Sequence, residues 1–410
     1  MRFAKDWRQL GLSLSDWKEY KIADLIEIIF SGGTPNTKVN EYWNGSLPWL
    51  SSGETKNRYI NSTEKTITES GAQNSSTRLA LSGDVVMASA GQGYTRGQVS
   101  FLNVNTFINQ SVIAIRANEK LLDKKFLFYN LSNRYEELRA ISDSNSIRGS
   151  ITTKMVKSMT INIPNLDTQK SIANVLSSID DKIENNKKIN HHLEQIAQAI
   201  FKSWFVDFEP FGGVKPSDWG TANLTDIAEY LNGLAMQKYR PVDDEESLPV
   251  LKIKELRQGT FDSSSDLCSA NIKSQYIIQD GDVIFSWSGS LLVDFWTGGT
   301  GGLNQHLFKV SSQKYDKWFY YSWTKYYLEE FIAIAADKAT TMGHITRRSL
   351  EKAKILIPND HDYKSIGLLL APIYRQIISN RIESRKLTEM RDTLLPKLLS
   401  GEISVNQATK

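Results

Sequence analysis

The chain has 410 residues, of which 40% are hydrophobic and 23% charged, and these values predict a globular protein of two or three domains. Its net charge of +3 is only mildly basic, so charge alone does not indicate a nucleic-acid partner, and any basic surface must be local. The single cysteine, Cys268, excludes an internal disulfide and multi-thiolate metal sites, and the lack of a long apolar run or apolar signal segment predicts a cytoplasmic protein with no membrane partner.

Residues 1–166 are predicted to form a first globular module. Residues 121–140 carry aromatic side chains three and four positions apart, which indicates a helix. The last strand-like run ends at Pro164, which separates it from the following helix. Clusters of Gly, Asn and Ser separate further short strand-like runs at 84–88, 99–104 and 111–115. This mixture predicts an α+β module with a mixed sheet.

Residues 167–210 are predicted to contain a long helix that packs against another helix. Within 167–204, apolar side chains recur at alternating steps of four and three residues, which is the heptad pattern of a coiled coil. Such a helix is roughly 55 Å long. Asp167 or Thr168 is expected to cap its N-terminus. The predicted seam consists of Ile172, Leu176, Ile179, Ile183, Asn186, Leu193 and Ile200.

After a short link at 205–217, residues 211–359 are predicted to form a second module of the same kind. Residues 317–336 have the helical aromatic spacing again, and the final strand ends at Pro358. Strand-like runs occur at 270–278, 283–287 and 307–310.

The heptad seam returns in the last segment, residues 360–410. Pro372 lies inside this second helix and is expected to kink it, because proline removes one backbone hydrogen bond. The second seam consists of Ile366, Leu370, Ile373, Ile377, Asn380, Leu387 and Leu394.

The second half of the chain repeats the first. Short elements recur at an offset that drifts from 202 to 194 residues, as loop insertions would cause. The repeated elements are Asp16-Trp17 with Asp218-Trp219, Gly83-Asp84 with Gly281-Asp282, Asn109-Gln110 with Asn304-Gln305, and Gly149-Ser-Ile151-Thr152 with Gly343-His-Ile345-Thr346. The order is therefore module, helix, module, helix.

This order predicts an α+β fold in which two globular domains with mixed sheets are separated by two long antiparallel helices, related by a pseudo-twofold axis. The helices run antiparallel because the second must return alongside the first. Asn186 and Asn380 then face each other, and a buried Asn layer sets register while lowering stability. Two separated modules suit a ligand with two separated half-sites, such as duplex DNA, whose turn is about 34–36 Å.

Catalytic motifs are not found. The sequence contains no Walker phosphate loop and no Asn-Pro-Pro-Tyr or Asp-Pro-Pro-Tyr segment, and its five histidines form no metal pattern. Asp123 with Lys125 is too common a pattern to indicate a nuclease site. We therefore predict no catalytic residue and no metal site in this chain.

Polar, aromatic and basic loops are the candidate reading surfaces. Arg reads guanine and Gln reads adenine, whereas Ser, Thr and Lys anchor phosphates, although the same residues also form ordinary solvated surface. The predicted DNA contacts of the first module are Ser52, Lys56, Arg58, Tyr59, Gln92, Tyr94, Arg96 and Arg148. Those of the second module are Lys252, Lys254, Arg257, Trp287, Ser288, His344, Arg347 and Arg348.

Three segments carry a resemblance to a known family: Ile172-Ala173…Leu176…Ile179-Asp180…Ile183, Phe201-Lys-Ser-Trp204-Phe205-Val-Asp207-Phe208, and the segment from Arg391 to Gly401-Glu402. Together with the duplicated order, they make nearly the whole chain resemble a specificity subunit of a type I restriction–modification system. Module two departs from the pattern, because it has Asn232-Gly-Leu-Ala235 where module one has Gly32-Gly-Thr-Pro35.

The resemblance implies a division of labour. Each module would be a target recognition domain that reads one half of an asymmetric bipartite site in double-stranded DNA. The helices would set the gap between the half-sites and dock two modification subunits, which bind S-adenosylmethionine and methylate adenine. Two restriction subunits would use ATP and Mg²⁺. No cofactor is expected in this chain.

Two other functions remain to be weighed. A single-chain adenine methyltransferase or nuclease would need catalytic motifs that the sequence lacks. A structural adaptor that binds only proteins is compatible with the small net charge, and salt-sensitive duplex binding would exclude it.

Overall fold

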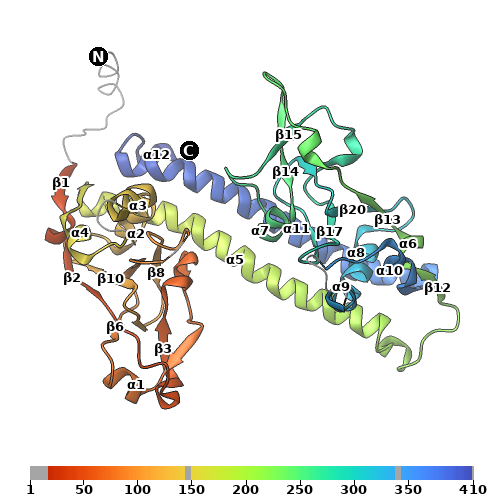
Figure 1. The fold of residues 1–410 in the computed structure, drawn as a ribbon, viewed down its shortest axis with the longest axis horizontal. Helices are drawn as coiled ribbons and strands as arrows, with labels where there is room; N and C mark the ends of the chain where they lie inside the picture. The colour runs from red at the N-terminus through yellow and green to blue at the C-terminus, as the bar shows by residue number, and fades with distance from the viewer. Residues whose placement is uncertain (1–16, 92, 144–148, 338–342, 409–410) are drawn as a thin grey trace. The chain divides into compact units, whose positions relative to one another are not determined.

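The computed structural model describes residues 17–91, 93–143, 149–337 and 343–408. The chain divides into two compact units: unit 1 comprises residues 1–180 and 390–410, and unit 2 comprises residues 181–389. Each unit contains a globular module and a part of each of two long helices (Figure 1). Among the described residues, no helix is long and apolar enough to cross a membrane.

The module of unit 1 contains mixed sheets, as predicted. The pairs β4–β8 and β3–β9 are parallel, and the other strand pairs are antiparallel. A small sheet joins β1 (Lys18–Lys21) to β11 (Thr160–Ile163). The two larger sheets have the orders β2 (Ile26–Ser31), β10 (Val112–Ala117), β7 (Val85–Ala88), β8 (Val99–Leu102), β4 (Tyr59–Ile60), and β5 (Lys65–Ile67), β3 (Trp43–Leu50), β9 (Thr106–Ile108), β6 (Arg78–Ala80).

Short helices complete this module. The single helix predicted at 121–140 is wrong in its continuity, because the segment forms two helices that meet near Asn133. The first begins at Lys124 because the Asp123 carboxylate accepts the backbone N–H of Phe126 at 2.9 Å and caps the helix. The helices are α1 (Glu69–Gln73), α2 (Lys124–Ser132), α3 (Tyr135–Asp143) and α4 (Thr153–Ser158).

The module of unit 2 has the same kinds of sheet. Its parallel pair is β14–β19. A small sheet joins β12 (Gly220–Asn223) to β21 (Lys354–Ile357). The larger sheets have the orders β13 (Glu229–Asn232), β20 (Leu307–Ser311), β17 (Val283–Ser286), β18 (Leu292–Phe295), and β15 (Leu267–Ser269), β14 (Ser247–Leu251), β19 (Gly301–Leu303), β16 (Ile277–Ile278).

Two predicted elements of this module need correction. The strand predicted at 270–278 is wrong for most of its length, because the Ser269 hydroxyl accepts the Asn271 N–H at 3.0 Å and turns the chain. The helix predicted at 317–336 is again two helices. The helices are α6 (Leu224–Ile227), α7 (Ile253–Gln258), α8 (Lys317–Tyr326), α9 (Leu328–Asp337) and α10 (Arg347–Lys352).

The strand orders confirm the internal repeat. The order β13-β20-β17-β18 matches β2-β10-β7-β8, and β15-β14-β19-β16 matches β5-β3-β9-β6. Within the described part of unit 2, no strand corresponds to β4.

The repeated Gly-Asp element builds the same turn in both modules. Gly83 has φ +95°, a backbone conformation that favours glycine. The Asp84 carboxylate accepts hydrogen bonds from Nε and Nη2 of Arg116, each at 2.8 Å. In unit 2, Asp282 accepts Lys309 Nζ at 2.8 Å. Both carboxylates also accept the backbone N–H three residues earlier. The element therefore has a structural role.

The long helices are α5 (Leu166–Phe205) and α11 (Asp360–Ser400). The predicted caps Asp167 and Thr168 are wrong, because Asn165 Oδ1 accepts the Thr168 N–H at 2.9 Å and the helix begins earlier. Asn359 Oδ1 does the same for the Asp362 N–H at 2.8 Å. Helix α11 continues through Pro372.

In unit 2, the two helices run antiparallel and are joined by a layer of asparagines. Asn186 Nδ2 donates to Glu383 Oε2 at 2.7 Å, and Asn190 accepts from Asn380 Nδ2 at 2.9 Å. Asn190 also donates to the carbonyl of Ile377 at 3.2 Å. Contacts that advance along α5 therefore move toward the start of α11, as in an antiparallel pair. Asn186 and Asn380 are buried, which confirms the predicted polar layer.

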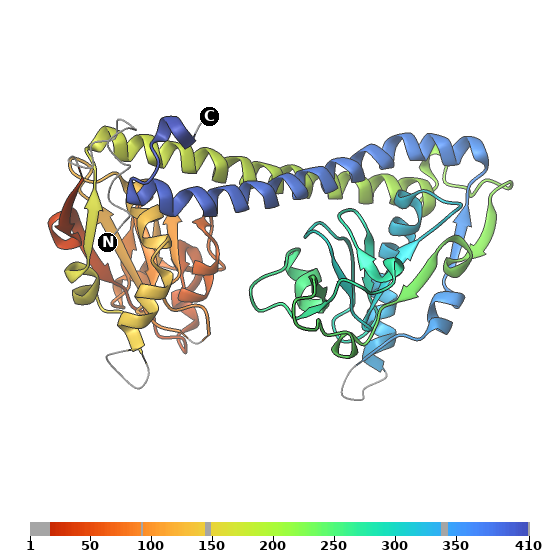
Figure 2. The same cartoon turned by 90° about the horizontal axis from the view of Figure 1, so that it is seen from above.

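In unit 1, the remaining parts of the helices share the module's core. Ile172 and Leu176 of α5 pack in one cluster with Leu395 and Leu398 of α11. Figure 2 shows the two helices side by side along this module. Most of the predicted seam is buried; its half-buried members are Leu193, Ile200, Ile373, Leu387 and Leu394, and its buried members are Ile172, Leu176, Ile179, Ile183, Asn186, Ile366, Leu370, Ile377 and Asn380.

A glycine lies at the same close backbone contact in both modules. A Cβ on Gly32 would lie 1.8 Å from the carbonyl oxygen of Ile108, and a Cβ on Gly233 would lie 2.2 Å from that of Asn304. The segment Asn232-Gly-Leu-Ala235 therefore keeps the glycine that the backbone requires, although it lacks the rest of the Gly-Gly-Thr-Pro pattern.

We predict that Gly233→Ala destabilises unit 2. The added methyl group has no room beside Asn304, so the backbone must separate, and overpacking of this kind lowers the free energy of unfolding by about 1–3 kcal/mol. Gly220→Ala is the matched control, because its Cβ would lie 3.9 Å from Ile357. Chemical denaturation of the two variants measures the difference, and equal stability would contradict the close contact.

Candidate nucleic-acid interface

The predicted contacts of module one lie in different environments. Tyr94 is 78% exposed, and its carbonyl accepts the Tyr135 hydroxyl at 3.1 Å. Lys56 is exposed and lies 3.9 Å from Glu64, and Ser52 is half-buried. Gln92 and Arg148 lie outside the described residues. Lys56, Ser52 and Tyr94 thus have surface available to a ligand.

Arg58 and Tyr59 instead contact a buried carboxylate of α5. Asp180 is 2% exposed and accepts Arg58 Nε at 2.9 Å and the Tyr59 hydroxyl at 2.8 Å. It also accepts the Tyr129 hydroxyl at 2.8 Å and Arg391 Nη1 of α11 at 2.7 Å. We call these five residues the Asp180 cluster. It ties the module of unit 1 to both long helices, so Arg58 and Tyr59 have a structural role there.

The charges in this cluster stabilise the ionised carboxylate. Burial alone raises the pKa of Asp180, but the positive charge of Arg58 and the hydrogen bond and charge of Arg391 outweigh it and lower the pKa below its ordinary value. Burial and the Asp180 charge together raise the pKa of Tyr59 and Tyr129, so both hydroxyls stay protonated as donors.

Arg96 is also turned inward. Its guanidinium pairs with Asp143 at the end of α3, and the residue is 7% exposed. Its predicted contact with DNA remains a prediction, and Tyr94 and Lys56 are the more accessible candidates of this module.

The basic residues of module two begin at helix α7. Lys252 pairs with Asp266, and Lys254 Nζ lies 2.9 Å from Asp262 Oδ2. Arg257, in the same helix, is exposed. Each lysine would have to exchange its carboxylate partner before it could contact a phosphate.

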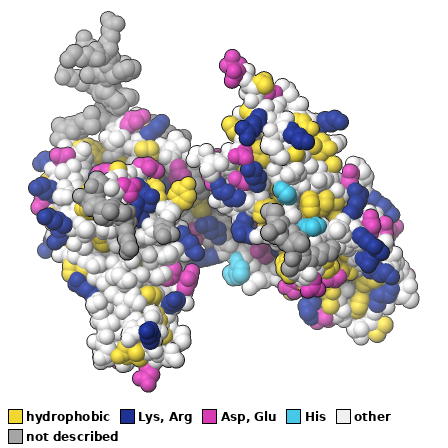
Figure 3. Space-filling model, viewed as in Figure 1, with side chains coloured by type: hydrophobic (Ala, Val, Ile, Leu, Met, Phe, Trp, Pro, Cys, Tyr) yellow, Lys and Arg dark blue, Asp and Glu magenta, His cyan; other side chains and the backbone are white. Residues whose placement is uncertain are grey.

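The structure brings Trp287, Ser288 and His344 together at the end of β17. Ser288 and His344 form an isolated antiparallel bridge, and the rings of Trp287 and His344 lie 6.3 Å apart, edge to face. The Ser288 hydroxyl lies 3.0 Å from His306 Nδ1. On the face in Figure 3, histidine side chains lie beside hydrophobic ones in the unit on the right.

Two exposed arginines follow His344 in the sequence. Arg347 and Arg348 are exposed in the first turn of α10 and form no ion pair with any residue that the structure describes. Lys154 is exposed in the first turn of α4, at the position equivalent to Arg348. Such residues are suited to contact phosphates.

Sequence reasoning missed His306 and Asn232, which belong to the same surface as Trp287. Asn232 Oδ1 accepts Trp287 Nε1 at 3.0 Å, and the rings of Trp287 and His306 lie 6.1 Å apart. The repeated Asn-Gln pair directly before His306 is the signal that could have identified this position.

The structure offers no metal site among the residues it describes, since no group of three or more His, Cys, Asp or Glu side chains could hold an ion. Cys268 is fully buried, and burial raises the pKa of its thiol. This thiol therefore has a packing role.

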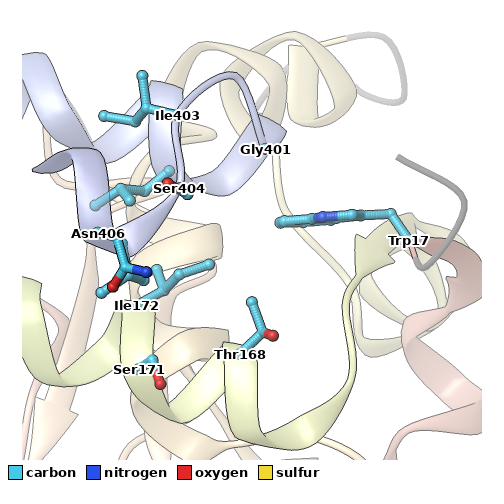
Figure 4. A pocket seen from close by; sticks show the side chains of 10 residues that line it. Trp17, Thr168, Ser171, Ile172, Gly401, Ile403, Ser404 and Asn406 are labelled. Carbon is cyan, nitrogen blue, oxygen red and sulfur yellow. The ribbon is translucent and has the colours of Figure 1, made fainter. Parts of the chain in front are cut away.

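A cavity of about 240 Å³ lies in unit 1 beside the start of α5 (Figure 4). Trp17, Ile172 and Gly401 are among its lining residues, and none of the lining residues is charged. In unit 2, the equivalent tryptophan, Trp219, contacts three phenylalanine rings instead: Phe205, Phe208 and Phe211. Without charge, this cavity is unsuited to a phosphate backbone.

The fold and these surfaces define an internally duplicated protein. The same arrangement of strands occurs twice, each copy presents a different polar surface, and each unit includes part of two long helices. Residues 14–195 and 216–388 match the family model described as "Type I restriction modification DNA specificity domain". Because the matches span most of the sequence, the chain belongs to this family.

Known proteins similar to the chain agree with this assignment. It is 29% identical over 422 positions to the type I restriction enzyme MjaIX specificity subunit of Methanocaldococcus jannaschii, covering 97% of this chain and 96% of the relative. It is 23% identical to the HindI specificity subunit of Haemophilus influenzae, covering 95% and 100%. A solved type I S subunit from M. genitalium has the same fold, with a TM-score of 0.61 and 15% identity over 94% of this chain and 98% of that one.

We predict that Asp180→Asn destabilises unit 1 in a pH-dependent way. At neutral pH the change leaves Arg58 and Arg391 without the anion between them, which lowers the free energy of unfolding by about 3–5 kcal/mol. The folded-state pKa of Asp180 is depressed, so its stabilisation is complete above about pH 4 and is lost as pH falls through the folded-state pKa. The difference between wild type and D180N should therefore narrow below about pH 4.

Asp181→Asn is the matched control, because Asp181 is the next residue of α5 and is exposed. Denaturation curves at pH 7, 5, 4 and 3 compare the three proteins. A D180N protein as stable as wild type at pH 7, or a difference that is the same at pH 3, would contradict the role of the cluster.

Proposed function

We propose that this chain is the DNA sequence-specificity subunit of a type I restriction–modification complex, in which each module reads one half of an asymmetric bipartite site in double-stranded DNA. The observation that carries the proposal is the match of both halves of the chain to one DNA specificity domain family. The repeated strand orders, combined with dissimilar loops, support two separate reading surfaces.

The helix pair is the proposed spacer between the half-sites. A layer of asparagines supports this role, because hydrogen bonds between Asn190 and Asn380 fix the register of α5 on α11 in a way that apolar contacts do not. A fixed register keeps the length of the pair constant.

The same helices are the proposed docking surface for two modification subunits. Hydrophobic side chains exposed on α5 and α11 in unit 2 support this, since Leu368 is 79% exposed and Ile196 is 48% exposed. Exposed apolar residues on a structured helix are suited to a protein partner. The modification subunits would bind S-adenosylmethionine and methylate adenine, and two restriction subunits would use ATP and Mg²⁺.

Methylation mapping tests the proposed function. The chain is expressed with the modification subunits of its system in a host that has no other adenine methylation, and methylated adenines are sequenced across the genome. The expected result is one motif of two defined half-sites separated by a gap of fixed length. Methylation without a two-part motif, or methylation that persists without this chain, would contradict the proposal.

We predict that shortening both helices shortens the gap. Deleting seven residues around Asn186 together with seven around Asn380 removes two turns from each helix and preserves the seam pattern. Seven residues correspond to about 10 Å, or roughly three base pairs. Methylation mapping measures the gap, and the unshortened complex is the control. A motif with an unchanged gap would show that the helices do not set the spacing.

A further inference from the structure

The two modules present different side chains at equivalent strand ends. In unit 1 the last pairing of β7 with β10 joins Ala88 to Val112, and in unit 2 the last pairing of β17 with β20 joins Ser286 to Leu307. The residues just beyond these pairs are Ser89 and Ser111 in unit 1, and Trp287 and His306 in unit 2.

In each module, a third segment forms a backbone hydrogen bond to this strand end. The Ile151 N–H donates to the Ser89 carbonyl at 2.8 Å, and the Ile345 N–H donates to the Trp287 carbonyl at 3.1 Å. The residue before each isoleucine is Ser150 in unit 1 and His344 in unit 2. The segment that leads into α4 or α10 therefore closes on the strand end in the same way.

These connections are made by the backbone and do not depend on the side chains. The same frame accepts Ser89, Ser111 and Ser150 in one module, and Trp287, His306 and His344 in the other. Positions with constant backbone and unlike side chains are suited to set specificity without disturbing the fold.

Resting on the proposed function, we infer that Trp287, His306 and His344 contact base edges of the second half-site and determine its specificity. The ligand is double-stranded DNA, and the aromatic trio is the reading group of module two.

Neighbouring side chains fix the trio in place. Trp287 stacks on Phe308 with ring centroids 5.7 Å apart and an interplanar angle of 30°. Its Nε1 donates to Asn232, so the indole contributes apolar surface to a ligand while its donor is occupied. An orientation held in this way lowers the entropy lost when a base edge is bound.

Two polar neighbours hold the His306 ring in place. Its Nε2 lies 3.3 Å from Gln305 Nε2, and its Nδ1 lies 3.0 Å from the Ser288 hydroxyl. Gln305 and Asn232 keep further amide groups at the same surface, and such groups pair with adenine in the major groove.

An exposed cation follows the third position in each module and is suited to contact a phosphate. Arg348 lies four residues after His344 and Lys154 four residues after Ser150, and both are exposed on the first turn of a helix. Phosphate contacts at equivalent places would bring each strand end against the duplex in the same orientation.

Methylation mapping of serine variants tests the inference. His306→Ser and His344→Ser, made singly, introduce the side chains that module one has at these positions. In the intact complex, each variant should relax discrimination at one or two base positions of a single half-site by about 10- to 100-fold, and leave the other half-site and the gap unchanged. His361→Ser, at the exposed start of α11, is the matched control and should leave the whole motif unchanged.

The outcomes separate this inference from the proposed function. Thermal denaturation first establishes that each variant is folded, and Trp287→Phe provides a second test in which a six-membered aromatic ring is kept while the pyrrole ring of the indole and its Nε1 donor are lost. A two-part wild-type motif that stays unchanged in both folded histidine variants would overturn the inference alone. A wild-type complex with no two-part motif would overturn the proposed function. Changes in both half-sites at once would also overturn the inference, since they would show a global effect.

Discussion

A buried carboxylate that receives four hydrogen bonds is the interaction on which unit 1 depends. Asp180 belongs to α5, and its donors come from the module and from α11. Removing a charge from water is unfavourable unless partners replace the solvent. Here two guanidinium groups and two hydroxyls do so. Because every donor must be in place together, the cluster allows only one position of the module on the helix pair.

In unit 2, a different group of charged residues connects the module to the long helices. Arg381 of α11 donates to Asp294 of β18 at 2.7 Å and to Glu194 of α5 at 2.8 Å. Burial alone lowers the pKa of Arg381, but the two carboxylates outweigh it and raise the pKa above its ordinary value. The centre of this group is a cation, whereas that of the Asp180 cluster is an anion. The repeat has thus kept the connection between module and helices and changed its chemistry.

The parts of the fold that follow from periodicity could be predicted from the sequence. The seam through Ile172 and Ile366, the facing asparagines and the repeated order of the modules all depend on residue spacing, which a sequence displays directly. The Asn165 cap of α5 and the Asp123 cap that starts α2 depend on single local hydrogen bonds, which spacing does not reveal. A turn at Asn271 replaced a predicted strand for the same reason.

The candidate site was predicted less completely because its residues meet through tertiary contacts. Trp287, Ser288 and His344 were identified by residue type, and the fold brings them together with His306, which residue type alone did not single out. Arg58 and Arg96 have the composition of DNA-binding residues, but burial and partners give them structural contacts. Residue type indicates what a side chain can bind, and only the fold determines whether a carboxylate of the same chain reaches it first.

The asparagine layer also has a consequence for the synthesis of the chain. Asn186 and Asn380 are 194 positions apart, so α5 leaves the ribosome long before its partner exists. At ordinary translation rates of about 5–20 residues per second, that interval is roughly 10 to 40 seconds. During this time the stripe of α5 is uncovered, and a chain being translated nearby offers the same stripe. Polar amides in the middle of that stripe weaken any pairing in which they meet apolar side chains, and so they restrict the registers in which such an early pairing can form.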